Sequence, residues 1–163
     1  MPDVISDGRT KVAFVDTIAN ITAPTVTELD AGLELQRVIT PDGLVGFEAS
    51  TAEVPNDSLA STFDTKTIGR DSFSGTLLRL KKQSGATDEA YTTLVKGTVG
   101  YIVIRRDKPA TDAWAAQDEV EVYPIVCGQT RLLPPEANTV RRYEVPTMIT
   151  DSPELRAVVA AGA

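Results

Sequence analysis

Residues 98–106 decide the fold, and they read TVGYIVIRR. Successive side chains of an extended strand point to opposite faces, so Val99, Tyr101 and Val103 share one face. The two isoleucines that alternate with them share the other face. Apolar residues on both faces are typical of a strand that is covered on both sides. This segment therefore predicts a strand inside a layered β structure.

Similar patterns recur on either side of this segment. Residues 119–123 read EVEVY, a strict alternation that is typical of a strand with one solvent-exposed face. Pro146 lacks a backbone N–H group and predicts a position near a sheet edge for the last strand. Besides residues 98–106, the predicted strands are residues 33–39, 62–68, 72–81, 119–126 and 138–149. The pattern predicts a mainly β fold, a two-sheet sandwich or barrel with one flanking α-helix.

Helical signals are few. Thr25 and Glu28 have the spacing of a capping box, which predicts one short helical turn. Residues 87–96 predict the main helix, because Thr87 can cap it and three apolar residues follow at helical spacing. Pro153 stands where a first helical turn favours proline and predicts a short helix near the C-terminus.

The length of 163 residues predicts a single domain with a sizeable core. Residues 1–20 carry an apolar patch without clean periodicity and predict an N-terminal arm or strand. Residues 48–61 are rich in small and polar side chains, which predicts a long loop. Residues 150–163 are expected to form a C-terminal tail.

Composition argues against most chemistries. The chain has no histidine, the commonest general base near neutral pH and the commonest transition-metal ligand. The single cysteine, Cys127, excludes an intrachain disulfide and lies in an apolar run that predicts burial. Residues 1–7 lack the features of a secretory signal, no apolar run approaches the length of a membrane span, and synthesis in a cytoplasm is expected. No catalytic residue, metal or cofactor is predicted.

Two alternatives to a structural role rest on particular side chains. Trp114, in a loop, offers a stacking platform for a carbohydrate-binding or adhesion module. Asp118, Glu119 and Glu121 offer the paired carboxylates of a glycosidase. A strand with one solvent-exposed face explains the alternation of acidic and apolar residues equally well, and packing within the loop explains the presence of Trp114.

Charge is distributed unevenly along the chain. The net charge is −7, with eleven acids and three bases in residues 1–64, and nine bases and four acids in residues 65–110. Such segregation predicts oppositely charged surfaces that meet between subunits, with Lys81 and Lys82 on the basic one. Reversing these two lysines is expected to slow assembly more than reversing Glu154.

The N-terminal region supplies the predicted apolar contacts between subunits. Phe14, Val15, Ile18 and Ile21 lie outside the cleaner strand pattern, so we expect them to contact a neighbouring copy. On this hypothesis, removal of residues 1–20 leaves a folded protein that cannot assemble.

Three segments resemble a known family. They are ITAPTVTELDAGLEL (residues 21–35), ITPDGL (residues 39–44) and AAQDEVEVYPIVCG (residues 115–128). They are similar to the major tail, or tail tube, proteins of long-tailed bacteriophages that infect actinobacteria. The resemblance covers about a quarter of the chain and consists of turn and strand patterns without a reactive residue.

The resemblance implies a structural protein that forms stacked hexameric rings, through whose hollow tube phage DNA passes without specific binding. It also implies a place in the virion tail, assembly in the host cytoplasm, and contacts with tape measure, terminator and distal tail proteins. An acidic chain suits such a conduit, because like charge repels DNA. Neither an enzyme nor a membrane protein is expected.

Overall fold

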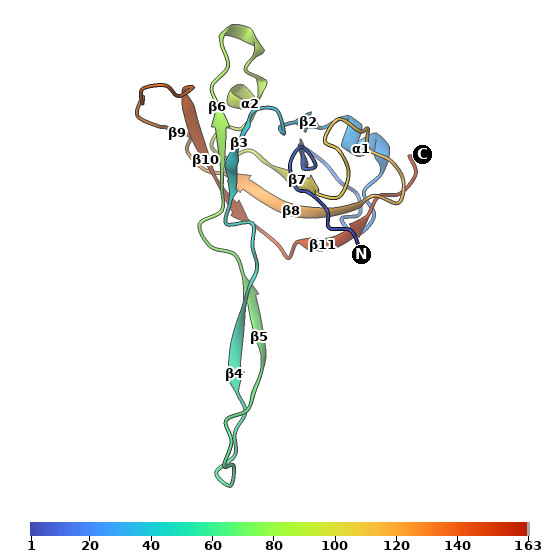
Figure 1. Ribbon diagram of the computed structural model, residues 1–163, viewed down its shortest axis with the longest axis vertical. Helices are drawn as coiled ribbons and strands as arrows, with labels where there is room; N and C mark the ends of the chain where they lie inside the picture. The colour runs from blue at the N-terminus through green and yellow to red at the C-terminus, as the bar shows by residue number, and fades with distance from the viewer. Residues whose placement is uncertain (163) are drawn as a thin grey trace.

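Strands dominate the computed structural model, which describes residues 1–162 and confirms the mainly β prediction (Figure 1). The strands are β1 (Lys11–Val15), β2 (Leu33–Glu34), β3 (Ile39–Val45), β4 (Ser50–Pro55), β5 (Lys66–Ser72), β6 (Leu77–Lys81), β7 (Val99–Arg105), β8 (Glu119–Cys127), β9 (Arg131–Leu132), β10 (Arg142–Ile149) and β11 (Glu154–Val158). The helical segments are α1 (Val26–Asp30), the 3-10 turn η1 (Gly85–Thr87) and α2 (Glu89–Thr93).

The strand predicted from residues 98–106 is β7, and it lies inside the sheet. It pairs antiparallel with β1, from Lys11↔Arg105 to Val15↔Tyr101, and with β8 on its other side. β2 extends the sheet beyond β1, and β11 pairs with β8. Residues 102–105 are all buried, so β7 is covered on both faces, as its sequence predicts.

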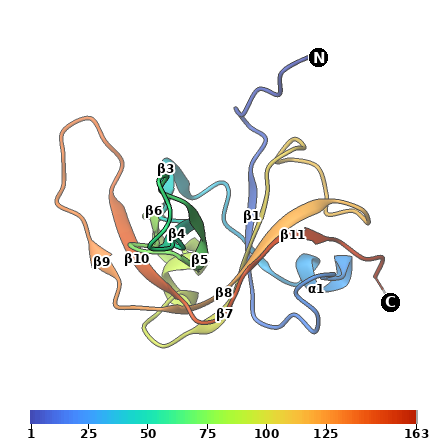
Figure 2. The ribbon, with the colours of Figure 1, turned by 90° about the horizontal axis from the view of Figure 1, so that it is seen from below.

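β10 joins this layer to a second one. Its residues 142–146 pair with β6, whereas residues 147–149 pair with β8. The edge position predicted from Pro146 is wrong, because β10 has a neighbour on each side. Pro146 lies where the strand changes partner, and its carbonyl accepts a 2.7 Å hydrogen bond from the Gly128 amide. The sheet continues through β6 to β3, and Figure 2 shows it curling so that β6 and β10 lie on the opposite side of the molecule from β1 and β11.

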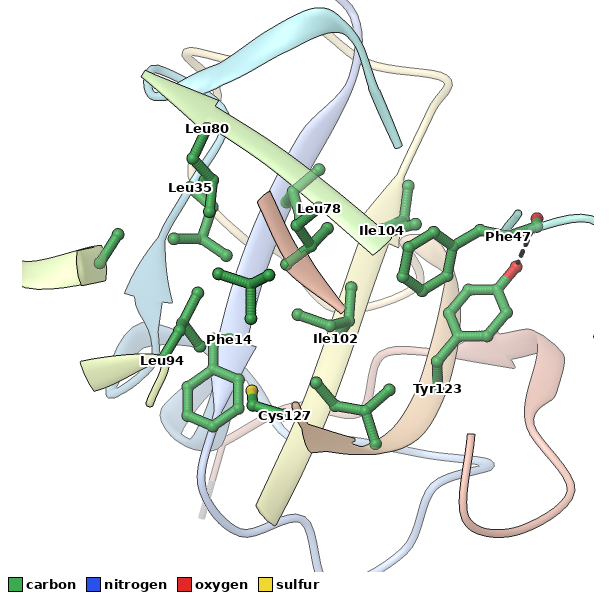
Figure 3. Close-up of a cluster of buried hydrophobic side chains, with 14 of the residues drawn as sticks. Phe14, Leu35, Phe47, Leu78, Leu80, Leu94, Ile102, Ile104, Tyr123 and Cys127 are labelled. Carbon is green, nitrogen blue, oxygen red and sulfur yellow. Dashed lines mark hydrogen bonds between the residues drawn. The ribbon is translucent and has the colours of Figure 1, made fainter. Parts of the chain in front are cut away.

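The principal core fills the inside of this curl (Figure 3). Phe14, Ile102 and Tyr123 contribute from one side, and Leu78 and Leu80 from the other. The Tyr123 ring packs edge-on against the Phe47 ring, with 5.1 Å between centroids. Edge-to-face aromatic pairs of this kind add stability beyond the area they bury.

A second core lies on the opposite face of β1, β7 and β8. Its buried side chains are Ala13, Val15, Ile18, Leu29, Val103, Trp114, Val120, Val122, Ala157 and Val159. α1 covers this face through Leu29, and its capping box forms as predicted from Thr25 and Glu28. Hydrogen bonds from the Thr25 and Ala19 amides hold the pKa of Glu28 below its usual value.

The predicted helix of residues 87–96 is only partly present. α2 covers Glu89–Thr93, and Thr87 belongs to η1 instead of capping α2. The Thr87 hydroxyl donates to the Ser84 carbonyl at 2.8 Å, so it is not available as a cap. The helix ends at Leu94, which leaves helical geometry to place its side chain in the core.

Several strands differ in extent from the prediction. The predicted strand at residues 33–39 is divided between β2 and the start of β3. The strands predicted at residues 62–68 and 72–81 begin four and five positions later, as β5 and β6. Residues 40–43 (TPDG), a sequence typical of a turn, lie within β3, where the pairing with β6 shifts register.

Two segments predicted as loop or helix are strands. Part of the loop expected at residues 48–61 is β4, which pairs with β5. The helix expected after Pro153 is β11, because residues 119–122 of β8 offer an open edge there and Ala157 is buried in the second core. Tertiary pairing thus overrides a local helix-start signal.

The close approach of β7 to β1 requires glycine at position 100. A Cβ atom there would lie 2.5 Å from Phe14 Cζ and 2.9 Å from the Val15 carbonyl oxygen. We expect Gly100→Ala to lower the free energy of unfolding by about 1–3 kcal/mol, measured by chemical denaturation, because the core must shift. Gly128→Ala is the matched control, since its Cβ meets only the flexible end of Met148 at 3.2 Å and Pro146 atoms beyond. Equal losses in the two variants would contradict the packing argument.

Candidate assembly surfaces

The most exposed element is a hairpin made of β4 and β5. The two strands form a sheet of their own that projects from the body along the longest axis of the molecule (Figure 1). Every residue of β4 is exposed, and in β5 only Gly69 is partly covered. A two-stranded hairpin without a packing partner is marginally stable in water. The hairpin therefore has the form of an element that is completed by contact with another chain.

Local contacts define the hairpin nevertheless. The Thr51 hydroxyl donates to the Asp71 carboxylate at 2.6 Å, and Lys66 forms an ion pair with Glu53 across the two strands. Asp57 accepts hydrogen bonds from Thr65, which closes the loop at the far end. These contacts set the register of the hairpin but cover none of its faces.

Large apolar side chains lie along the hairpin without cover. The exposed fraction is 79% for Phe63 and 80% for Ile68, and Val54 and Leu59 are also exposed. Soluble monomers rarely gather exposed apolar residues in this way, and such surfaces mark interaction sites. The hairpin is the strongest candidate for a contact between subunits.

The N-terminal residues predicted to contact a neighbour lie in the cores of the chain itself. Phe14, Val15 and Ile18 are 2–5% exposed, and Ile21 packs at the margin of the second core. Residues 11–15 form β1, whose side chains are needed on both faces of the sheet. The prediction is therefore wrong for the three buried residues. The exposed apolar side chains near the N-terminus are Met1, Val4 and Ile5.

The two lysines predicted on the basic surface have different environments. Lys82 Nζ lies 2.6 Å from the buried Asp88 carboxylate and 4.3 Å from the centroid of the Tyr91 ring. Lys81 lies opposite Arg142 in the pairing of β6 with β10 and is half-buried. Reversing Lys82 would break contacts within the chain, so only Lys81 reports cleanly on contacts between copies.

The acidic group considered for glycoside hydrolysis is engaged in structural contacts. Burial acts to raise the pKa of Asp118, but hydrogen bonds from Lys108, the Ala115 amide and Arg105 outweigh it, and the pKa lies below its usual value. Arg105 Nη1 is 2.9 Å from the Asp118 carboxylate, and both side chains are almost fully buried.

The two glutamates of the same group offer no better acid pair. Glu121 lies 2.6 Å from Arg106 Nε and accepts a 3.1 Å hydrogen bond from the Tyr123 hydroxyl. Glu119 is exposed at the start of β8. A strand with one solvent-exposed face, the simpler interpretation of the alternating sequence EVEVY, accounts for both glutamates.

Trp114 does not form a ligand platform. Its side chain is 4% exposed, and its ring lies about 5 Å from the cationic groups of Lys11 (5.1 Å) and Arg105 (5.2 Å). A ring covered in this way cannot stack on a sugar in solution. The side chain on which the carbohydrate-binding alternative depends is a core residue.

Reactive and metal-binding groups play little part. Cys127 is buried, as predicted, and burial raises the pKa of its thiol to about 11. Residues 1–162 contain no cluster of three metal-ligating side chains. Among the helices of these residues, none is long and apolar enough to cross a membrane.

The hairpin is the surface that sequence reasoning missed. Residues 48–61 lack the Asn-Gly or Asp-Gly dipeptide that signals a tight hairpin, and the ten residues between β4 and β5 conceal the pairing. A sequence signal for the two strands does exist. The β-branched residues Val54 and Ile68, which favour strands, stand among small polar residues near Pro55 and Lys66.

Comparisons with known proteins agree with these features. A family described as phage tail tube protein matches residues 1–162. Among solved structures, the chain is similar to a chain of the anti-feeding prophage baseplate, determined by cryo-electron microscopy and 6-fold symmetrised. The TM-score is 0.53, the identity is 12%, and the match covers 93% of this chain and 95% of that chain. No curated protein matches the chain in sequence.

The two findings carry different weight. At 12% identity, the likeness to the baseplate chain shows a shared fold. The family match extends over nearly the whole sequence and includes the three segments that resemble major tail proteins. This chain belongs to the phage tail tube protein family and is a structural component of a phage tail.

Proposed function

We propose that copies of this chain close into rings of six, and that the rings stack into the hollow tube through which phage DNA enters the host. The hairpin of β4 and β5 is the observation that carries the proposal, because it extends from the body without cover on either face. Family membership and the fold shared with a chain of a 6-fold symmetrised baseplate support it.

The proposed role requires no reaction. Asp118 and Glu121 are held in ion pairs, and Cys127 is a buried thiol of raised pKa, so these groups act as structural residues. The net charge of −7 supports a conduit that DNA passes without binding, because like charges repel. We expect assembly in the host cytoplasm and contacts with tape measure, terminator and distal tail proteins. An actinobacterial host stays a prediction.

Negative-stain electron microscopy of the purified chain tests the proposal. We expect rings of six subunits or hollow tubes, and native mass spectrometry should give six copies or multiples of six. A chain that stays monomeric at high concentration and in the presence of tail-tip proteins would contradict the proposal. Rings of another number would retain the tube and correct the stoichiometry.

The rate of assembly is expected to depend on salt. Complementary charge speeds encounter and sets orientation, and salt shortens the Debye length from about 10 Å at 0.1 M to about 3 Å at 1 M. Exposed ion pairs contribute only about 0–1 kcal/mol each, so apolar contacts must hold the finished tube. Light scattering should therefore show slower growth in 1 M than in 0.05 M salt, while tubes diluted into 1 M salt persist. Equal growth rates would mean that the charge asymmetry does not act in assembly.

A further inference from the structure

The loop at the far end of the hairpin combines apolar and acidic side chains. Residues 56–65 join β4 to β5, and all of them are exposed. They include Asp57 and Asp64 and no basic residue. Leu59 is fully exposed and Phe63 is 79% exposed. We call residues 56–65 the hairpin tip.

The hairpin tip lies beyond the reach of its own domain. An extended strand advances about 3.3 Å per residue, so the path from Ser50 to Leu59 spans roughly 30 Å. Figure 1 shows the hairpin running straight away from the body. Neither large apolar side chain of the tip contacts a core cluster of its own chain within residues 1–162. Whatever covers these side chains must come from another molecule.

The opposite end of the long axis carries the reverse charge. There β6 ends beside the start of β10, with α2 and the segment that follows β9 close by (Figure 1). Lys81 pairs with Arg142 in register, and the Lys82 amide donates to the Arg141 carbonyl at 2.8 Å. The Lys81 amide donates to the Val38 carbonyl at 2.7 Å, and this contact brings Arg37, the residue before Val38, to the same end of the molecule. We call this group the basic end, and its cations are Arg37, Lys81, Lys82, Arg141 and Arg142.

Part of the charge at the basic end is free for another molecule. Lys82 is paired with Asp88, and Arg142 Nη2 lies 3.3 Å from the Glu136 carboxylate. The other three cations have no carboxylate within 4.0 Å among residues 1–162, and Arg37 and Arg141 are exposed. The exposed apolar side chains of this end are Leu132, 50% exposed, and Val140, 59% exposed.

We infer that the hairpin tip of one copy binds the basic end of a second copy, so that subunits stack head to tail along their long axis. This inference rests on the proposed function and names the surface that receives the hairpin. Each end carries both an apolar pair and an unneutralised charge, of opposite sign in the two ends, which is the complementarity that selects a partner and its orientation. Two different mating surfaces on one chain produce an open stack, as a tube requires.

Charge exchange tests the pairing. Asp64→Arg and Arg141→Asp are each expected to slow tube growth by about tenfold at low salt, because each places like charges at the contact. The chain that carries both substitutions should regain most of the wild-type rate. Asp30→Arg is the matched control, since it makes the same change of charge on an exposed position of α1 and should leave growth unchanged. Absence of recovery in the double variant would overturn the pairing.

Disulfide trapping locates the contact directly. Leu59→Cys and Val140→Cys are placed in separate chains, which are mixed and oxidised under assembly conditions. We expect a covalent dimer from the mixture and none from either chain alone, since the native Cys127 is buried and unreactive. Tubes that form normally without this crosslink would overturn the inference.

The readouts separate this inference from the proposed function. If Asp64→Arg abolishes tubes but leaves six-membered rings, the tip acts between rings, and recovery in the chain that also carries Arg141→Asp then identifies the basic end as its partner. If Asp64→Arg forms tubes at the wild-type rate, the inference fails while the proposed function stands. If the wild-type chain forms neither rings nor tubes, the proposed function fails first.

Discussion

Removal of residues 1–20 is expected to unfold the protein. The deletion takes away β1, whose five residues pair with β7 and are all buried. Loss of a large buried apolar side chain costs about 2–5 kcal/mol, and the deletion removes several. Their sum equals or exceeds most of the roughly 5–15 kcal/mol that stabilises a typical domain. The truncated chain should lack a cooperative thermal transition in circular dichroism and should accumulate as insoluble protein.

Removal of residues 1–7 is the matched control. These residues are exposed and precede Gly8, whose carbonyl accepts a 2.7 Å hydrogen bond from the Ala110 amide. The shorter deletion should therefore keep the wild-type melting transition. A cooperative transition in residues 21–163 would contradict the role of β1 in the core and restore the expectation that residues 1–20 serve assembly and are not needed for folding.

Replacement of Arg105 by methionine is expected to lower the free energy of unfolding by about 3–5 kcal/mol, the usual cost of removing one partner of a buried ion pair. The guanidinium is 1% exposed and lies 2.9 Å from Asp118. It also donates to the carbonyls of Pro109, Asp112 and Ala113 at 2.9–3.0 Å, so it fixes the segment between β7 and β8. Urea denaturation gives the size of the effect.

The neighbouring Arg106 provides the control for this replacement. It carries the same charge on the next residue, but its ion pair with Glu121 is partly exposed. Exposed ion pairs contribute about 0–1 kcal/mol, so Arg106→Met should have a small effect. Similar losses in the two methionine variants would contradict the special role of Arg105.

Asp118→Asn should reveal the same pair through pH. The pKa of Asp118 is lower in the folded state, so its ionised form stabilises the protein above the usual value of 3.8, and this contribution is lost as the pH falls through the folded pKa. The difference in free energy of unfolding between wild type and Asp118→Asn should be largest at pH 7 and should shrink as the pH falls below about 4. A gap that is constant with pH would exclude an ionic contribution.

The sequence predicted those elements whose local pattern and tertiary role agree. β7 and β8 have apolar residues where the two cores lie, and Thr25 and Glu28 cap α1 without help from distant residues. In such segments, the information needed for the structure lies within a few residues.

Prediction failed where distant pairing determines the structure. Ser152 and Pro153 form a valid helix-start signal, but the free edge of β8 draws the following residues into β11. Pro146 signals an edge, yet the sheet accommodates it where β10 changes partner. Neither partner is visible from the local sequence.

The prediction of residues that contact a neighbouring subunit failed for a related reason. An apolar side chain has the same appearance in a sequence whether its own core or a neighbouring molecule covers it, so Phe14 and Val15 could not be assigned before the fold was known. Phe63 and Leu59, the exposed residues, occur in a segment whose small polar composition is typical of a loop. Burial distinguishes the two groups, and only the structure supplies it.

The pairing of β1 with β7 has a consequence for synthesis. Lys11 meets Arg105 across the sheet, so the first strand waits until more than ninety further residues have left the ribosome. β-rich domains dominated by such non-local pairs fold in about milliseconds to seconds, slower than helical proteins of similar size. During translation, the apolar side chains of β1 therefore stay exposed until β7 has been synthesised. Several nascent chains on one messenger RNA expose this aggregation-prone segment close to one another. The distance between β1 and β7 in the sequence thus makes β1 a segment that chaperones would protect during synthesis.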